Sequence, residues 1–191
     1  MLAFPEPPPT LADRTAALRL AAERDIPETL IAHQDDPALA RALGLRRPPS
    51  ASELGRRAER SAAERAAGRE LWLTVLAAGA TDECLGQLDV HDVEPEDARA
   101  SLTIWIAPGR RRRGLGSAAL ALAGRWLIEE VGLARLQMFA DPRDRAIRGA
   151  ALRAGFRPEG VLRGYRAGLG RAGFRVDAAV FSLVAADLGA R

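Results

Sequence analysis

The sequence contains no lysine and no asparagine, so all 28 of its basic residues are arginines. Together with the abundance of alanine, this bias is typical of a GC-rich genome and does not indicate a function. The chain also has a single cysteine, Cys84, which excludes an internal disulfide and a cysteine-based metal cluster. A lone cysteine fits a reducing compartment, and we interpret Cys84 as a packing residue.

Long apolar runs are absent as well. The longest run, Leu71 to Ala80, is far shorter than the roughly 20 residues that a membrane-spanning helix needs. The N-terminus lacks the basic and apolar regions of a secretion signal. We therefore expect a cytoplasmic protein that has no membrane partner.

Neither sign of charge is in large excess. The formal net charge is +3, because 25 acidic residues are interspersed among the arginines. The high isoelectric point therefore reflects the high pKa of arginine rather than a strongly basic surface. We expect no nucleic-acid partner, since the one run of four arginines is not accompanied by another basic stretch or by interleaved aromatic residues.

At 191 residues, of which 48% are hydrophobic, the chain is long enough for one sizeable core. We expect residues 1–15 to be a flexible, proline-rich arm and residues 16–187 to be one domain. Asp25 is expected to cap the first helix, and residues 188–191 to form a tail. Hydrophobic periodicity predicts strands at 16–21, 71–77, 84–91, 98–106, 133–140, 161–165 and 176–184, and helices at 25–35, 38–43, 50–68, 115–131 and 144–154.

The stretch Ile104 to Leu120 organises the chain, because a strand end is followed there by a turn, four arginines and a helix start. Gly114 and Gly116 lie where that helix begins. The first N–H groups of a helix have no partner within it, and glycine lets a phosphate approach them closely. The pattern therefore predicts an anion site, to which Arg111 to Arg113 add charge. A simple tight turn and a solvated or nucleic-acid-binding arginine run are the alternatives.

In this context, Arg111-x-x-Gly114-x-Gly116 resembles the pyrophosphate loop of the GNAT acyltransferases. The order of the predicted elements is also similar to that of the GNAT fold, from about Ala16 onward. Residues 141–163 and 173–183 resemble the branch that contains the ribosomal-protein N-terminal acetyltransferases. The resemblance implies an α/β (α+β) fold with a central, mixed but mostly antiparallel, twisted sheet of about seven strands flanked by helices.

The resemblance also implies a reaction, the transfer of an acetyl group from acetyl-CoA, the cosubstrate, to a primary amine without a metal. The amine belongs to a peptide or protein N-terminus or to a small molecule. The strand end at Trp105–Ile106 is expected to separate from its neighbour and to bind the pantetheine amides. A homodimer is among the oligomeric states that the resemblance allows. The implied CoA-binding residues are Trp105, Ile106, Arg111, Arg112, Arg113, Gly114, Leu115, Gly116, Ser117 and Asp144.

Several positions that move protons or contact the cofactor depart from the family pattern. Ser101 stands where members of this branch often have a glutamate, and Asp144 stands where they usually have an asparagine that binds the cofactor. Ile147 replaces a frequent serine, and Ala151 replaces a tyrosine that serves as the acid in other GNAT enzymes. Two function classes therefore stay open: an active N-acetyltransferase, and an acyl-CoA-binding protein that has lost turnover and acts as a regulator or partner.

The predicted strand at 84–91 offers a substitute base. It places Asp89 and His91 on one face, while the next strand places Ser101 and Thr103 on a polar face. If these faces coincide, His91 is the candidate proton acceptor and Ser101 a second candidate catalytic residue, because a neutral imidazole accepts a proton at neutral pH. A solvated histidine at a strand end is the alternative interpretation.

The acceptor amine is usually held in this family by the first helices and by loops between the late strands. These segments correspond to Asp25–Asp36 and Arg163–Phe174. Acidic side chains such as Asp35 and Asp36 would attract a cationic amine. Both are equally compatible with an ordinary helix surface, and we expect His33 to be a surface residue too.

Overall fold

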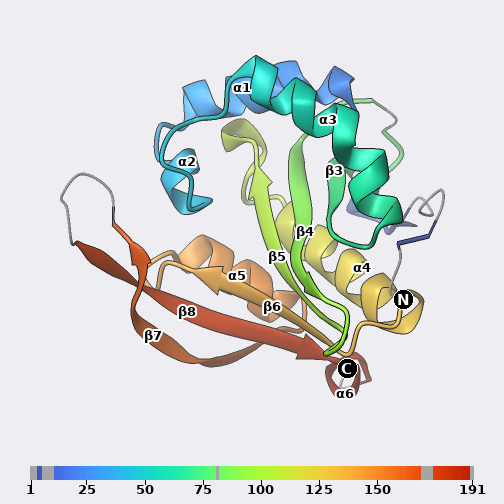
Figure 1. Cartoon of the computed structure of the whole chain (residues 1–191), viewed down its shortest axis with the longest axis vertical. Helices are drawn as coiled ribbons and strands as arrows, with labels where there is room; N and C mark the ends of the chain where they lie inside the picture. The colour runs from blue at the N-terminus through green and yellow to red at the C-terminus, as the bar shows by residue number, and fades with distance from the viewer. Residues whose placement is uncertain (1–3, 6–10, 81, 169–173, 190–191) are drawn as a thin grey trace.

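The computed structural model describes residues 4–5, 11–80, 82–168 and 174–189, and its strands and helices follow the predicted order (Figure 1). Residues 1–3 and 6–10 of the expected arm, 169–173 of the glycine-rich connection and the last two residues lie outside the described ranges. The strands are β1 (Leu11–Ala12), β2 (Ala16–Leu20), β3 (Leu71–Ala77), β4 (Gly86–Glu94), β5 (Arg99–Ile106), β6 (Arg135–Ala140), β7 (Arg157–Ala167) and β8 (Arg175–Val184). The helices are α1 (Ile26–Asp35), α2 (Leu39–Ala42), α3 (Ala51–Ala66), α4 (Leu115–Glu129), α5 (Arg145–Arg153) and α6 (Ala185–Leu188), with 3-10 turns η1 (Glu23–Asp25) and η2 (Pro108–Arg110).

The strands form one eight-stranded sheet in the order β1-β2-β3-β4-β5-β6-β8-β7. Every neighbouring pair is antiparallel except β5 and β6, which run parallel and are joined through α4. A parallel connection needs such a crossover, because a tight turn joins only antiparallel strands. The mixed, mostly antiparallel sheet that the resemblance implies is therefore confirmed, with eight strands where about seven were expected.

Two layers of helices cover the sheet (Figure 1). Helices α4 and α5 lie behind it and seal the main core, in which Leu120, Leu127 and Trp126 of α4 are almost completely buried. Together with Leu115, Ala119 and Ala123 they form the broad buried face of this helix. Helices α1, α2 and α3 cover the upper part of the opposite face. No helix among the described residues has the length and hydrophobicity needed to cross a membrane.

Several local expectations need revision. Within the expected arm, Leu11–Ala12 forms β1 against β2, and Phe4 is buried in the main core. The sheet thus begins before Ala16. The expected tail begins inside α6, a short helix that follows β8 directly. His33 is buried, with 6% of its surface exposed, instead of lying on the surface.

Candidate functional site

The loop between β5 and α4 turns sharply at two residues with positive φ. Arg112 has φ +64° and Gly114, the N-cap of α4, has φ +82°. No side chain caps the first turn of α4. The N–H groups of Leu115, Gly116 and Ser117 therefore have neither a helical partner nor a cap. This is the backbone arrangement that the glycine pattern predicted, and it suits an anion.

The side of α4 that faces the end of β5 is kept open by Gly116. A Cβ at this position would lie 3.6 Å from Ile106 Cγ1 and 3.9 Å from the Cβ of Ala150. A methyl group would just fit, whereas a branched side chain would fill the space beside the N–H groups. The loop thus has the exposed backbone that a pyrophosphate requires.

The four arginines of the loop divide into two pairs. Arg110 forms an ion pair with Glu83, and Arg111 forms one with Asp36 at 2.7 Å. Arg111 Nε also donates to the carbonyl oxygen of Ile106 at 2.9 Å, so this guanidinium ties the loop to both α1 and β5. Partial burial would raise the pKa of Asp36, but the hydrogen bond from Arg111 leaves that pKa below its usual value.

Arg112 and Arg113 are exposed, and no acidic partner holds either of them within the part of the chain that the structure describes. They are the two arginines of the loop that remain available for an anionic ligand. The assignment of Arg111, Arg112 and Arg113 to CoA stays a prediction, and Arg111 would have to share its guanidinium with Asp36.

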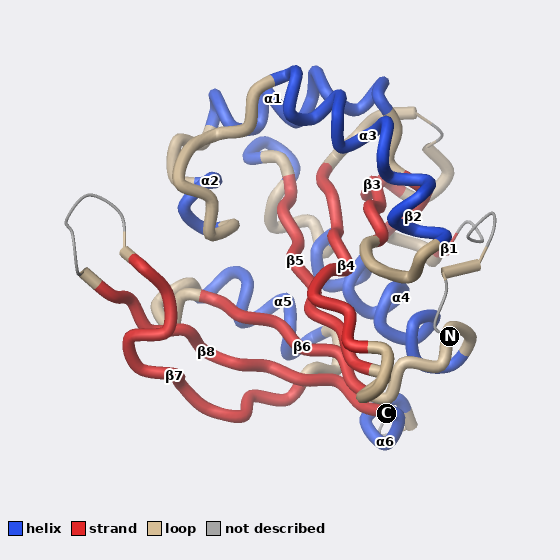
Figure 2. The backbone as a smooth tube through the Cα atoms, viewed as in Figure 1, coloured by secondary structure: helices blue, strands red, loops and turns tan. Residues whose placement is uncertain are grey.

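Strand β5 separates from β6 at its C-terminal end, as expected. The last paired residues are Leu102 and Met138, and Figure 2 shows the two strands diverging beyond them. The backbone of Thr103 to Ile106 therefore has no partner on the β6 side among the described residues. Trp105 contributes its backbone to this open edge, while its side chain is buried beside Cys84 under α1 and α2. An open strand edge of this kind offers N–H and C=O groups to an amide-containing ligand.

The polar faces of β4 and β5 coincide. Asp89 pairs with Thr103, and His91 pairs with Ser101, so all four side chains lie on the same side of the sheet. His91 Nε2 lies 2.8 Å from Thr103 Oγ1, and Nδ1 lies 3.0 Å from a carboxylate oxygen of Asp92. The His91 side chain is 35% exposed, so it is held in place but remains accessible.

Ser101 lies on the same polar face, directly across from His91 in the strand pairing, and is buried. Its hydroxyl accepts a hydrogen bond of 3.2 Å from Gln137 Nε2 on β6. Gln137 is a site residue that the sequence reasoning missed. Its signal was its place in the strand pattern, because alternation from the core residues Leu136 and Met138 puts Gln137 on the polar face.

Asp89 forms an ion pair with Arg57 of α3 on this face, at 3.1 Å. Burial raises its pKa, although the nearby Arg57 of α3 opposes the shift. Arg57 also pairs with Glu70 and lies 4.5 Å from the centre of the Trp72 ring. The Asp89 carboxylate lies beside Thr103 in the β4–β5 register, so it is a second candidate proton acceptor on this face.

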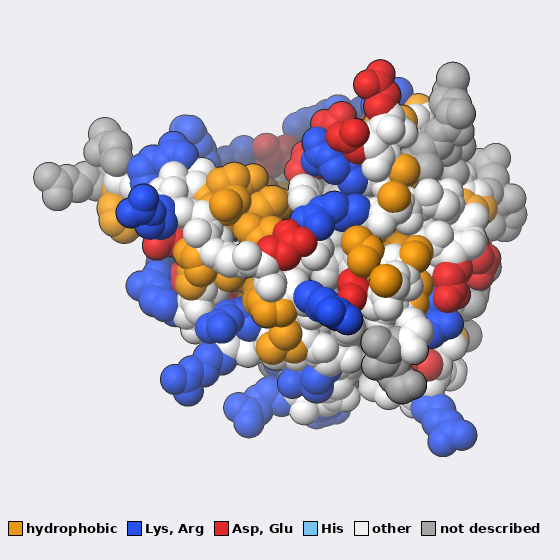
Figure 3. Space-filling model, turned by 90° about the horizontal axis from the view of Figure 1, so that it is seen from below, with side chains coloured by type: hydrophobic (Ala, Val, Ile, Leu, Met, Phe, Trp, Pro, Cys, Tyr) orange, Lys and Arg blue, Asp and Glu red, His pale blue; other side chains and the backbone are white. Residues whose placement is uncertain are grey.

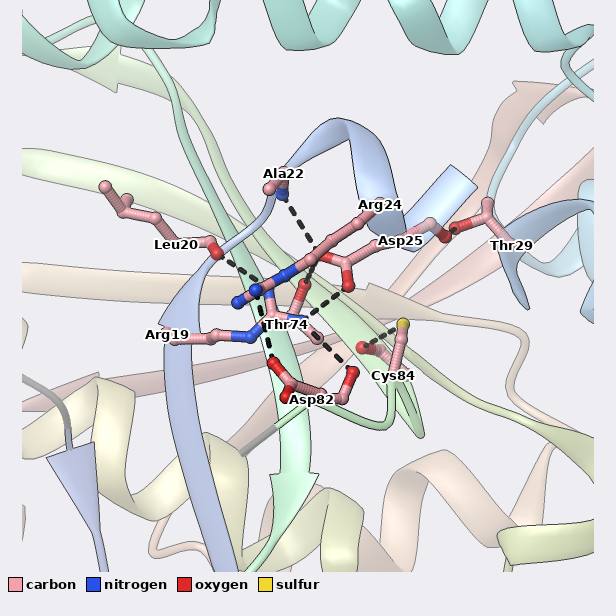
Figure 4. Close-up of polar contacts among 10 residues, drawn as sticks. Arg19, Leu20, Ala22, Arg24, Asp25, Thr29, Thr74, Asp82 and Cys84 are labelled. Carbon is pink, nitrogen blue, oxygen red and sulfur yellow. Dashed lines mark hydrogen bonds and ion pairs between the residues drawn. The ribbon is translucent and has the colours of Figure 1, made fainter. Parts of the chain in front are cut away.

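A different polar cluster lies at the other side of this face, and it is closed (Figure 4). The Asp25 carboxylate is only 1% exposed and accepts two hydrogen bonds from Arg19, one from Thr74 and one from the backbone N–H of Ala22. Asp25 does occupy the N-cap position of α1, as expected, but its side chain makes no capping hydrogen bond there. The carboxylate turns inward because a bidentate arginine is a stronger partner than the helix start.

Cys84, next to this cluster, acts in packing. It is 4% exposed, and burial raises the pKa of its thiol to about 12. The thiol therefore stays protonated at neutral pH and is not a nucleophile.

Asp144 caps α5. One of its carboxylate oxygens accepts the backbone N–H groups of Ala146 at 2.9 Å and Ile147 at 3.1 Å. The position that would bind a cofactor amide in relatives thus has a local structural task here, and its contact with CoA stays a prediction. Ala151 is buried in the core and offers no proton donor.

Residues 16–157 match the family model described as an acetyltransferase (GNAT) domain. The chain belongs to the GNAT acetyltransferase family. No curated protein sequence matches it.

Solved structures share the fold. Mycobacterium smegmatis RimJ in complex with CoA-disulfide is 22% identical, with 97% of this chain and 92% of RimJ covered and a TM-score of 0.82. RimL, a ribosomal L7/L12 alpha-N-protein acetyltransferase in its apo form, is 17% identical, with 92% and 94% covered and a TM-score of 0.78. The microcin C7 self-immunity acetyltransferase MccE, in complex with acetyl-CoA and AMP, is 18% identical, with 90% and 93% covered and a TM-score of 0.73.

Proposed function

We propose that this GNAT protein transfers the acetyl group of acetyl-CoA to a primary amine. One observation carries the proposal: the uncapped, glycine-lined start of α4 lies directly after the open end of β5. The first feature suits a pyrophosphate and the second suits the amides of a pantetheine arm. The CoA-disulfide and acetyl-CoA in the RimJ and MccE structures support the same class of cosubstrate.

In this proposal the N–H groups of Leu115 to Ser117, with Arg112 and Arg113, hold the phosphates. The backbone of Trp105 and Ile106 binds the pantetheine amides, and Asp144 borders the cosubstrate from the start of α5. Holding the thioester and the amine together makes the reaction effectively unimolecular, which removes roughly 7–11 kcal/mol from the barrier. Positioning then supplies most of the rate.

The reaction requires two proton movements. The amine nitrogen attacks the thioester carbon, a C–N bond forms, the C–S bond breaks, and the thiolate leaves. His91 is proposed to take the proton that the attacking amine loses, through Thr103 or an ordered water. The departing thiolate is protonated from solvent.

Three residues favour a second candidate function, that of an acyl-CoA-binding protein without turnover, because each has a structural role in place of a catalytic one. Ser101 is a buried hydrogen-bond acceptor, Asp144 is a helix cap and Ala151 is part of the core. None of them supplies the acid or base that relatives use there. Measuring CoA release with acetyl-CoA and a panel of peptides, polyamines and aminoglycosides separates the two functions, because only the enzyme releases CoA in step with acetylated amine.

The CoA loop is tested by Gly116→Val. The branched side chain fills the space between α4 and Ile106, so we expect CoA affinity measured by calorimetry to fall by about tenfold or more, which corresponds to ~1.4 kcal/mol. Gly109→Val is the matched control, since a Cβ at Gly109 meets nothing within 4 Å. An unchanged affinity in Gly116→Val, with the circular dichroism spectrum preserved, would refute the loop assignment.

A further inference from the structure

An aromatic pair stands beside the opening between β5 and β6. Phe139 follows Met138, the last residue of β6 that pairs with β5, and its ring stacks on that of Tyr165 from β7. The ring centroids are 4.9 Å apart, with an angle of 14° between the planes. Alternation along β6 places Phe139 on the same face as Gln137, which contacts Ser101. The pair therefore lies on the side of the sheet that carries the proposed proton acceptor.

Arg166 completes this surface. Its guanidinium carbon lies over the Phe139 ring at 6.0 Å from the centroid. The loop that ends α2 approaches from the other side, since a Cβ at Gly44 would lie 3.8 Å from Arg166 Nη1. We call Phe139, Tyr165 and Arg166 the aromatic–arginine surface.

A β-bulge aims these side chains. Between the pairs Leu162–Ala178 and Arg166–Val176, β7 contains more residues than β8, and Gly164 takes φ +59° within that segment. Adjacent residues of a regular strand point to opposite faces, so Tyr165 and Arg166 reach the same ring only because the strand is irregular here.

Two side chains of the neighbouring strand β8 anchor the bulge. The N–H of Gly164 donates to Asp177 at 2.7 Å, while Arg175 donates to the carbonyl oxygens of Gly164 at 2.7 Å and Tyr165 at 2.8 Å. The Asp177 carboxylate is therefore already engaged by a backbone N–H group. Bulges commonly re-aim side chains in this way, and this one turns Tyr165 and Arg166 toward the Phe139 ring.

The charges around this surface are unbalanced. Arg166 has no acidic partner among the described residues, and the nearby Asp177 is already bonded to the N–H of Gly164. Asp36, one of the acidic residues considered for attracting a cationic amine, is already paired with Arg111. Figure 3 shows hydrophobic side chains next to several arginines on the β7–β8 side of the molecule.

We propose that the aromatic–arginine surface selects the acceptor, and that it favours primary amines carrying a flat aromatic ring and a carboxylate close to the reacting nitrogen. This inference rests on the proposed function. Tyr165 is 44% exposed, so a second ring can stack on the pair. Arg166 is half-buried and free of acidic partners, and its planar guanidinium binds a carboxylate through two hydrogen bonds.

The amine could belong to a free amino acid or to the N-terminus of a peptide, and two sets of matched acceptors distinguish these sources. The first set is phenylalanine, leucine and phenylalaninamide, which differ in the ring or the carboxylate. The second is a hexapeptide with Phe at position 2 and Asp at position 3, with Leu and Asn versions as controls. We expect kcat/KM to be about tenfold higher for the acceptor that has both groups, in whichever set is accepted.

Variants assign the preference to residues. Tyr165→Leu should abolish the preference for the ring, whereas Tyr165→Phe should keep it. Arg166→Gln should abolish the preference for the carboxylate, and Arg60→Gln, the same change at an exposed arginine of α3, should not. The inference is overturned if ring-bearing and carboxylate-bearing acceptors are used no better than their controls, or if the preferences survive Tyr165→Leu and Arg166→Gln.

A binding measurement separates this inference from the proposed function. The same acceptors are titrated by calorimetry into the protein saturated with desulfo-CoA, which cannot react. Preferential binding without any acetylation would contradict the proposed function and support the acceptor surface. Equal or absent binding, in a protein that acetylates other amines, would contradict the acceptor surface alone.

Discussion

Two polar clusters lie on the same face of the sheet, and they differ in how completely their groups are satisfied. The Asp25 carboxylate is 1% exposed and accepts four hydrogen bonds. The His91 imidazole is 35% exposed and is oriented by two neighbours, Thr103 and Asp92. A saturated, buried group stabilises the fold, because every change to it leaves a partner unpaired. An oriented but accessible group retains the freedom to exchange a proton with a ligand.

The comparison predicts the largest loss of stability at the closed cluster. Asp25→Ala leaves the Arg19 guanidinium and the Thr74 hydroxyl without their partner, which costs about 3–5 kcal/mol when a buried ion pair is broken. Urea denaturation measures this loss. Glu23→Ala, an exposed acid in the same 3-10 turn, is the matched control and should change stability by less than about 0.5 kcal/mol. Equal effects of the two substitutions would contradict the structural role of Asp25.

The closed cluster also predicts an acid limit of stability. Burial would raise the pKa of Asp25, but the hydrogen bonds from Arg19, Thr74 and Ala22 outweigh it, so that the pKa lies below its ordinary value. The carboxylate thus stabilises the fold above its unfolded-state pKa, and this contribution is lost as the pH falls through the folded-state value. Asp25→Ala should therefore unfold with a flatter pH dependence than the parent between neutral and acidic pH.

Substitutions in the accessible cluster of His91, Thr103 and Asp92 are expected to lower the rate of the reaction with little loss of stability. His91→Gln removes the proposed proton acceptor and should lower kcat/KM by about 10²-fold, the low end for general-base catalysis. The acidic limb of the pH profile should disappear with it. Thr103→Val removes one of the two partners of the imidazole and should lower the rate less. If His91→Gln keeps both the rate and the acidic limb, the base is elsewhere on this face, and Asp89 is the next residue to replace.

The smallest expected effect lies at the edge of the sheet, where an ion pair is neither buried nor near the reaction. Hydrogen bonds from Arg135 and then Ser182 lower the pKa of Glu159 from 4.5 to about 2. Its contribution is therefore present above pH 4.5 and is lost as the pH falls toward 2. Because the Glu159 side chain is 41% exposed, solvent screens the pair, and Glu159→Gln should cost less than about 1 kcal/mol in urea. A loss of stability as large as that of Asp25→Ala would contradict the inference that solvent exposure makes the Glu159 pair weaker than the buried Asp25 cluster.

The sequence alone determined what depends on neighbours along the chain. Strand alternation, helix periodicity and the glycines before α4 predicted the order of the elements and the uncapped loop, because these signals arise from local backbone chemistry. The same alternation placed Asp89 and His91 on one face. Alternation within one strand does not determine whether these side chains meet Ser101 and Thr103, because that depends on the register between two strands.

Only the tertiary structure decided which distant groups meet. The register of β4 on β5 brought His91 to Thr103, and the fold turned the side chain of Asp25 from an expected helix cap into a buried partner of Arg19. The bulge in β7 directed Tyr165 toward Phe139, which no strand pattern predicts. Such contacts depend on register, on burial and on competition among several possible partners. These are properties of the packed chain as a whole, and local propensity does not contain them.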